Sequence, residues 1–227
     1  MNKLYTKNEL LFAIVWIIVY IVGTIIFDNI ATALKITNFL TPLFYILLCS
    51  ILLIWIIKNK INTKFGLCKS PFSAKYFLFY IPLLILISTN FWFGASLNYG
   101  IVESILNVLS MLCVGLVEEI IFRGFLFKSL EKDNKNSAII ISSVTFGIGH
   151  LINLFSTGLD NLLPNICQVF YAIAVGFLFV IIFYKGGSLI SCILTHSLVN
   201  AFSVFQNISA LNIYTEIITS IAIIYNH

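Results

Sequence analysis

The hydrophobic and polar positions of the chain alternate on the scale of whole helices rather than of single residues. Long apolar runs are separated by short stretches that are rich in lysine, asparagine and serine. A helix needs about 17–25 apolar residues to cross the hydrocarbon core of a membrane, and most of the runs reach this length. The pattern therefore predicts an all-α, polytopic membrane protein with about eight transmembrane helices, at residues 10–27, 38–57, 76–93, 101–127, 138–154, 162–184, 189–205 and 213–225.

The polar stretches between these runs are too short to separate two domains. The longest of them spans residues 59–75, and no internal repeat is visible. The first apolar run is long and has no small-residue cleavage site after it, so we expect a retained helix rather than a signal peptide. Residues 1–227 are therefore predicted to form a single integral membrane domain.

The composition excludes an ordinary soluble domain. Hydrophobic residues make up 60% of the chain and charged residues only 10%, and the mean hydropathy is +1.03. A soluble domain carries about 25% charged residues, which it needs to cover its surface. The net charge of +4 is modest, so we expect membrane lipid around the protein and no nucleic-acid partner. The five cysteines have no paired spacing, which argues against a disulfide framework or a thiolate metal site.

The lysines predict how the helices are oriented. If the N-terminus is cytoplasmic, the only lysine in an outer segment is Lys35. The cytoplasmic segments then contain Lys3, Lys7, Lys58, Lys60, Lys64, Lys69, Lys75, Lys128, Lys132, Lys135 and Lys185. Because cytoplasmic loops carry an excess of basic residues, this distribution predicts a cell-membrane protein with both termini in the cytoplasm.

The most unusual polar residues lie inside the predicted helix at 101–127. Glu118, Glu119 and Arg123 fall within a run that is otherwise apolar, although one charge at the bilayer centre costs at least about 2.5–3.5 kcal/mol. Glu119 and Arg123 are four residues apart, so they share a helix face and can form an ion pair. Glu118 lies about 100° around the helix, without an obvious local partner. The pair alone fits a structural role equally well, but Glu118 is a candidate reactive group.

Three further polar residues are predicted at a similar depth in the membrane. His150 lies in the run at 138–154, and His196 and Asn200 share one face of the run at 189–205. Counted from the nearest polar segments, Glu118 and both histidines lie about 15–18 Å deep in a core about 30 Å thick. Any one of them could simply bridge helices, and Gly147 and Gly149 are best interpreted as close-packing positions. Together they predict a buried, water-containing site.

Several common protease signatures are absent. The chain has no H-E-x-x-H, no G-x-S-x-G and no aspartate inside a predicted helix, which argues against a thermolysin-like zinc protease, a serine hydrolase or an aspartic dyad. A carboxylate, two imidazoles and an amide remain. Such a set can deprotonate a water molecule and stabilise an oxyanion, as amide hydrolysis requires.

Three motifs in order resemble a known family. Glu118-Glu119-x-x-x-Arg123, Phe146-x-x-x-His150 and His196-x-x-x-Asn200 are similar to the motifs of the CPBP family of CAAX proteases and bacteriocin-processing enzymes, also called Abi. The resemblance covers about residues 101–205, which would carry the catalytic core. It implies that Glu118 and His150 activate a water molecule, that His196 and Asn200 hold the oxyanion, and that Glu119 and Arg123 brace the first group.

The resemblance also implies an intramembrane endopeptidase that acts on a membrane-associated peptide or protein, with a role in bacteriocin maturation or self-immunity. We expect no cofactor, although zinc held by Glu118, His150 and His196 remains an alternative because the family is often labelled a metalloprotease. A non-catalytic immunity or scaffold protein and a small proton-coupled transporter are the other hypotheses. The sequence does not predict an oligomeric state.

Overall fold

The computed structural model describes residues 1–73, 75, 80–152, 162–207, 209 and 210. Within these ranges every regular element is a helix, and the only β contact is an isolated bridge between Ala95 and Gln206. The all-α prediction is thus confirmed. The elements are α1 Asn2–Lys7, α2 Glu9–Leu34, α3 Thr37–Lys58, α4 Ile81–Ser88, η3 Thr89–Phe91, α5 Ile101–Glu119, η4 Ile120–Phe127, α6 Lys128–Leu130, α7 Lys135–Gly149, η5 His150–Ile152, α9 Leu162–Gly186 and α10 Ile190–Ser203.

Four continuous helical stretches of the described chain are long and apolar enough to cross a membrane. They are Glu9–Leu34, Phe39–Lys58, Ile101–Leu130 and Leu162–Gly186, the third of which joins α5, η4 and α6. The predicted number of eight spans is therefore not confirmed, although the protein is a multi-pass membrane protein. The predicted spans at 76–93, 138–154 and 189–205 correspond to the shorter helices α4 with η3, α7 with η5, and α10. The span at 213–225 lies outside the described residues.

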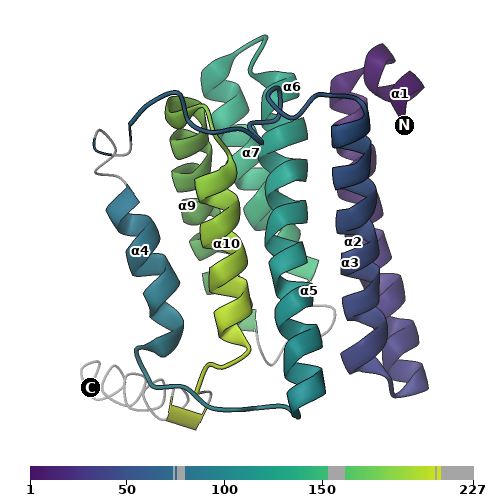
Figure 1. Ribbon diagram of the computed structural model, residues 1–227, viewed down its shortest axis with the longest axis vertical. Coiled ribbons are helices and arrows are strands. Elements are labelled where there is room, and N and C mark those ends of the chain that lie inside the picture. The colour runs from purple at the N-terminus through teal and green to yellow at the C-terminus, as the bar shows by residue number, and fades with distance from the viewer. Residues whose placement is uncertain (74, 76–79, 153–161, 208, 211–227) are drawn as a thin grey trace.

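The shorter helices show why apolar runs overstate helix length. Pro82 stands in the first turn of α4, where a missing backbone N–H is tolerated. After α10 the chain turns at Val204 and Phe205, which are still apolar. A helix packed among other helices can be shorter than the bilayer thickness, because its ends are covered by protein rather than by lipid. In Figure 1, α10 lies between α4 and α5.

Glycines let two pairs of helices approach closely. A Cβ at Gly115 of α5 would lie 2.6 Å from the backbone nitrogen of Ser197 on α10, and one at Gly147 of α7 would lie 2.2 Å from the side chain of Ile173 on α9. Small residues at such crossings are typical of membrane helix packing. The predicted packing role therefore holds for Gly147. For Gly149, a Cβ would meet none of the residues that the structure describes within 4 Å, so no close packing is seen there.

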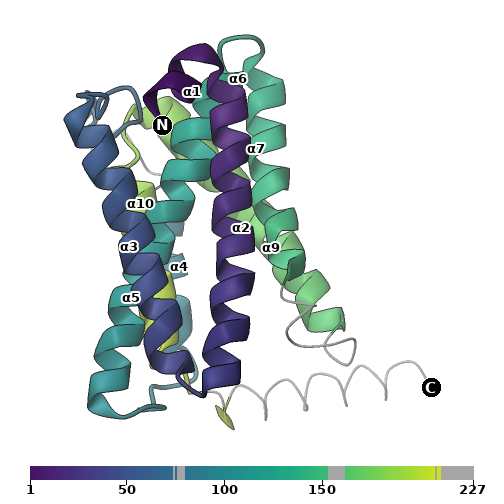
Figure 2. The same cartoon turned by 90° about the vertical axis from the view of Figure 1, so that its right-hand side faces the viewer.

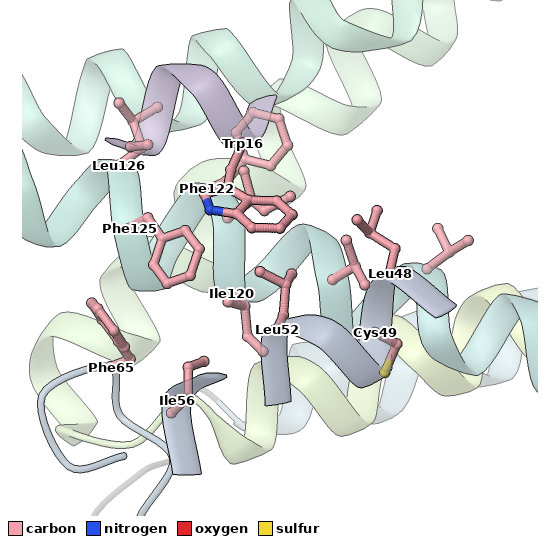
Figure 3. Packing of buried hydrophobic residues seen from close by; sticks show 14 of the residues in the cluster. Trp16, Leu48, Cys49, Leu52, Ile56, Phe65, Ile120, Phe122, Phe125 and Leu126 are labelled. Carbon is pink, nitrogen blue, oxygen red and sulfur yellow. The ribbon is translucent and has the colours of Figure 1, made fainter. Parts of the chain in front are cut away.

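A hydrophobic cluster joins α2 and α3 to η4. Figure 3 shows Trp16 of α2 and Leu52 of α3 close to Phe122 and Phe125 of η4. The rings of Phe12 and Phe125 are 5.0 Å apart in an edge-to-face arrangement, which aromatic pairs prefer. This packing holds α2 against the segment that follows the two glutamates.

The opposite face of α2 is apolar and is not covered by the part of the chain that the structure describes. Ile14, Ile18, Val22 and Ile25 are all exposed and recur at intervals of three or four residues, so they form one stripe along the helix. A stripe of this kind in contact with water would be unfavourable. It is the surface expected to face lipid acyl chains.

The lysine-rich segments gather at one end of the helices. α1, α6 and the segment after α3 lie at the same end in Figures 1 and 2. There Glu9 accepts hydrogen bonds from Lys64 and from Lys132, each at 2.7 Å. This end is the one that the basic residues predict to be cytoplasmic.

Candidate active site

The two glutamates stand where α5 ends and a stretch of π-helix begins. α5 ends at Glu119, and η4 continues as a π-helix from Ile120. π-helical turns are rare and occur often at functional sites. Both glutamates are buried, so their charges need partners inside the protein.

The predicted pair between Glu119 and Arg123 is present. Arg123 Nη1 lies 2.9 Å from Glu119 Oε1, and both side chains are 0% exposed. The guanidinium carbon also lies 4.2 Å from the ring centroid of Phe146 and 5.6 Å from that of Phe179, distances at which a cation is attracted to an aromatic face. Among the described residues, Arg123 Nε and Nη2 have no hydrogen-bond partner. The charge of Arg123 therefore depends on Glu119 and on these two rings.

His196 connects the two glutamates. Its Nδ1 lies 2.8 Å from Glu119 Oε1, and its Nε2 lies 3.2 Å from Glu118 Oε2. Glu119 Oε1 is therefore shared between Arg123 and His196. The sequence placed His196 on one face with Asn200 but did not predict this bridge, because it joins α5 to α10 across a long stretch of chain.

Tyr20 is a site residue that the sequence motifs missed. Its hydroxyl group donates a hydrogen bond of 2.6 Å to Glu118 Oε1. The available signal was the spacing along α2, where Phe12, Trp16, Tyr20 and Thr24 follow one another at intervals of four and so share a face. The first two are buried and apolar, and the stripe becomes polar where α2 reaches the level of Glu118.

A cavity of about 330 Å³ opens beside Glu118. Four of the predicted site residues line it, namely Glu118, His150, His196 and Asn200. Glu119 and Arg123 are fully buried and are not among its lining residues. The other lining residues are Tyr20, Ile21, Thr24, Tyr45, Met111, Val114, Phe122, Phe146, Gly149, Ile152 and Gln168. The structure thus brings three distant segments together around one space that is large enough for water and part of a ligand.

A second cavity of about 130 Å³ shares a wall with the first. The shared residues are Phe146, His150, Gln168, His196 and Asn200. The rest of its wall is mostly apolar and comes from Leu86, Tyr171, Ala172, Val175, Phe179 and Val199. The histidines and the asparagine therefore lie between a polar space and an apolar one.

His150 follows directly on the end of α7. It is the C-cap residue of that helix and begins the short η5. Its Nδ1 lies 3.2 Å from the backbone oxygen of Phe146, and the two rings pack edge to face with their centroids 5.1 Å apart. These contacts fix the ring of His150 at the cavity wall.

The described residues show no grouped set of possible zinc ligands. Among the residues that the structure describes, no three His, Cys, Asp or Glu side chains form a group that could hold a metal ion. Both ring nitrogens of His196 face carboxylate oxygens, so in this arrangement the imidazole is engaged with Glu118 and Glu119. The expected independence of a cofactor stays a prediction.

Residues 100–202 match the family model described as Type II CAAX prenyl endopeptidase Rce1-like. This segment is similar to the Rce1-like family. The match agrees with the resemblance to the CPBP family that the three motifs indicated. It runs from α5 to the last turn of α10 and leaves out all the elements from α1 to η3. Neither the curated proteins nor the solved structures gave a match.

Proposed function

We propose that the protein is an intramembrane endopeptidase that hydrolyses a peptide bond of a membrane-associated peptide or protein. One observation carries the proposal: the buried carboxylate of Glu118 lines a cavity together with His150, His196 and Asn200. The match of residues 100–202 supports it, because the family that they resemble is described as an endopeptidase.

Glu118 is the base in this proposal. It accepts a proton from a water molecule in the cavity while the water oxygen attacks the carbonyl carbon of the substrate. The proton then passes to the amine that leaves when the C–N bond breaks. A positioned base of this kind typically contributes a factor of about 10²–10⁴ to the rate. His150 lines the same cavity and helps to orient the water.

The oxyanion of the tetrahedral intermediate needs donors on the opposite side of the reacting carbon. The family resemblance assigns this role to His196 and Asn200. Both ring nitrogens of His196 face carboxylates, so we assign the direct contact with the oxyanion to the Asn200 amide. His196 then acts by contacting both carboxylates, which fixes the position of Glu118 relative to Glu119.

Glu119 and Arg123 support the site without lining the cavity. Their ion pair lies outside the cavity lining, so neither group is placed to contact the substrate. Glu119 also contacts His196. The pair therefore fixes the imidazole, which in turn contacts the base.

The substrate proposed here is a hydrophobic peptide segment at the membrane. A cavity of about 330 Å³ is at the small end of the range for ligand sites, about 300–1,000 Å³, so it accommodates a few residues around one bond. A CAAX-type C-terminus is the substrate that the family description names. Bacteriocin maturation or self-immunity is the biological role that we propose.

Comparative peptidomics tests the proposed function. Membranes from cells that produce the wild-type protein, the Glu118→Gln variant or neither are compared by mass spectrometry. We expect peptides with new termini only with the wild-type protein. Identical peptide sets in all three samples, with the protein present in the membrane, would contradict the endopeptidase proposal and favour a non-catalytic scaffold.

A further inference from the structure

A hydrogen bond to the proposed base comes from a helix outside the Rce1-like segment. Tyr20 lies on α2, and residues 100–202 do not include that helix. Its hydroxyl group donates to Glu118 Oε1 at 2.6 Å. We propose that Tyr20 is a positioning residue that holds the Glu118 carboxylate in its reactive orientation. This inference rests on the proposed function, because it assigns Tyr20 a role in the same reaction.

The Glu118 carboxylate is held at both of its oxygen atoms. Tyr20 donates to Oε1, and His196 Nε2 lies 3.2 Å from Oε2. The terminal torsion of a glutamate has broad energy minima, so a carboxylate with one partner can still rotate. Partners at both oxygens, from α2 and α10, restrict this rotation. A base must be held within about 0.5 Å and 10–20° of its productive geometry, which is what such a restraint provides.

Tyr20 is itself held in place by its neighbours. Thr24 Oγ1 donates to the Tyr20 backbone oxygen at 2.8 Å, a bond within α2 that does not involve the Tyr45 hydroxyl group. The rings of Tyr20 and Tyr45 are 6.1 Å apart. About two turns earlier in α2, the ring of Phe12 packs on the ring of Phe125 of η4. α2 therefore packs on the segment that follows Glu118, and it presents the phenol to the carboxylate.

Removal of the Tyr20 hydroxyl group provides the test, and Tyr45 provides the matched control. Tyr20→Phe removes the donor to Glu118, whereas Tyr45→Phe removes a hydroxyl group from the same cavity wall whose bond goes to Thr24. Both proteins are purified into lipid nanodiscs. The kinetic probe is an internally quenched farnesylated peptide with a CAAX C-terminus, together with its unprenylated copy.

The first readout is kinetic. Hydrogen bonds to charged groups are strong enough that we expect kcat to fall about 10–100-fold in Tyr20→Phe with KM nearly unchanged. Tyr45→Phe should change kcat by less than about 3-fold relative to the wild-type protein. Equal losses in the two variants would overturn the inference, because both phenols would then serve only to complete the cavity wall.

The second readout does not depend on activity. The infrared carboxylate band of Glu118 is assigned by its absence in Glu118→Gln. It should shift in Tyr20→Phe and stay in place in Tyr45→Phe, because the frequency of a carboxylate responds to the hydrogen bonds that it accepts. An unshifted band in Tyr20→Phe overturns the inference. A wild-type protein that cleaves neither the probe nor membrane peptides overturns the proposed function, and the band still decides whether Tyr20 holds Glu118.

Discussion

The two adjacent glutamates should differ in how the same substitution affects stability. Glu118→Gln keeps the size of the side chain and an oxygen that can accept the Tyr20 hydrogen bond. We therefore expect a protein that folds and melts like the wild type but cleaves about 10²–10⁴-fold more slowly, which is the usual cost of losing an essential base.

Glu119→Gln should instead destabilise the protein. It removes the charge that pairs with Arg123 at 2.9 Å, where both side chains are 0% exposed. Breaking a buried pair by removing one partner costs roughly 3–5 kcal/mol. At about 2–4 °C per kcal/mol for a chain of this size, Tm should fall by roughly 6–20 °C. Activity should fall as well, because Glu119 also contacts His196.

Arg123→Gln and the double variant complete the comparison. Arg123→Gln should resemble Glu119→Gln, since it leaves the opposite charge buried and unpaired. The double variant should recover part of the lost stability but not all of it, because the contacts of Arg123 with Phe146 and Phe179 are also lost. The assay measures Tm and cleavage rate for all four variants in the same detergent. Early melting of Glu118→Gln, together with a stable but inactive Glu119→Gln, would refute the assignment of the two roles.

Three further results are expected. In a background without native cysteines, a cysteine that replaces Lys64 should react only with reagents that enter the cytoplasm. A cysteine that replaces Leu97 should react with membrane-impermeant reagents added outside the cell. The reverse pattern would refute the predicted topology. Activity should survive dialysis against a strong chelator, whereas stoichiometric zinc that is lost in His150→Ala would indicate a metal-assisted hydrolase. Gly115→Ala should cost about 1–3 kcal/mol, because its Cβ would overlap the backbone of α10. Gly149→Ala should leave Tm unchanged, because its Cβ would have no described residue within 4 Å. Equal Tm values for the two glycine variants would contradict the packing.

The sequence predicted the features that depend on local spacing. The all-α class follows from apolar runs of membrane length, and the Glu119–Arg123 pair follows from the four-residue periodicity of a helix. Equal depths along separate helices also anticipated that Glu118, His150 and His196 line one cavity. Each of these features is visible within a single helix or in the order of the helices along the chain.

The features that the sequence did not predict depend on how helices pack laterally. Spacing within α10 placed His196 next to Asn200 but gave no information on the face of α5 that His196 contacts. Tyr20 belongs to a helix without a motif, and a tyrosine in an apolar run is often only a packing residue. The helix lengths differed because apolar composition continues into turns, as it does at Val204.

The most direct test of the account is whether Glu118 delivers water to a peptide bond. Purified wild-type protein and Glu118→Gln are incubated in nanodiscs with the farnesylated CAAX peptide, or with a peptide found by the comparison of membranes, in water enriched in ¹⁸O. Mass spectrometry of the products then locates the label. We predict one ¹⁸O atom in the new C-terminal carboxyl group with the wild-type protein and no product with Glu118→Gln. Labelled product at the wild-type rate from a stable Glu118→Gln protein would contradict the role assigned to this glutamate.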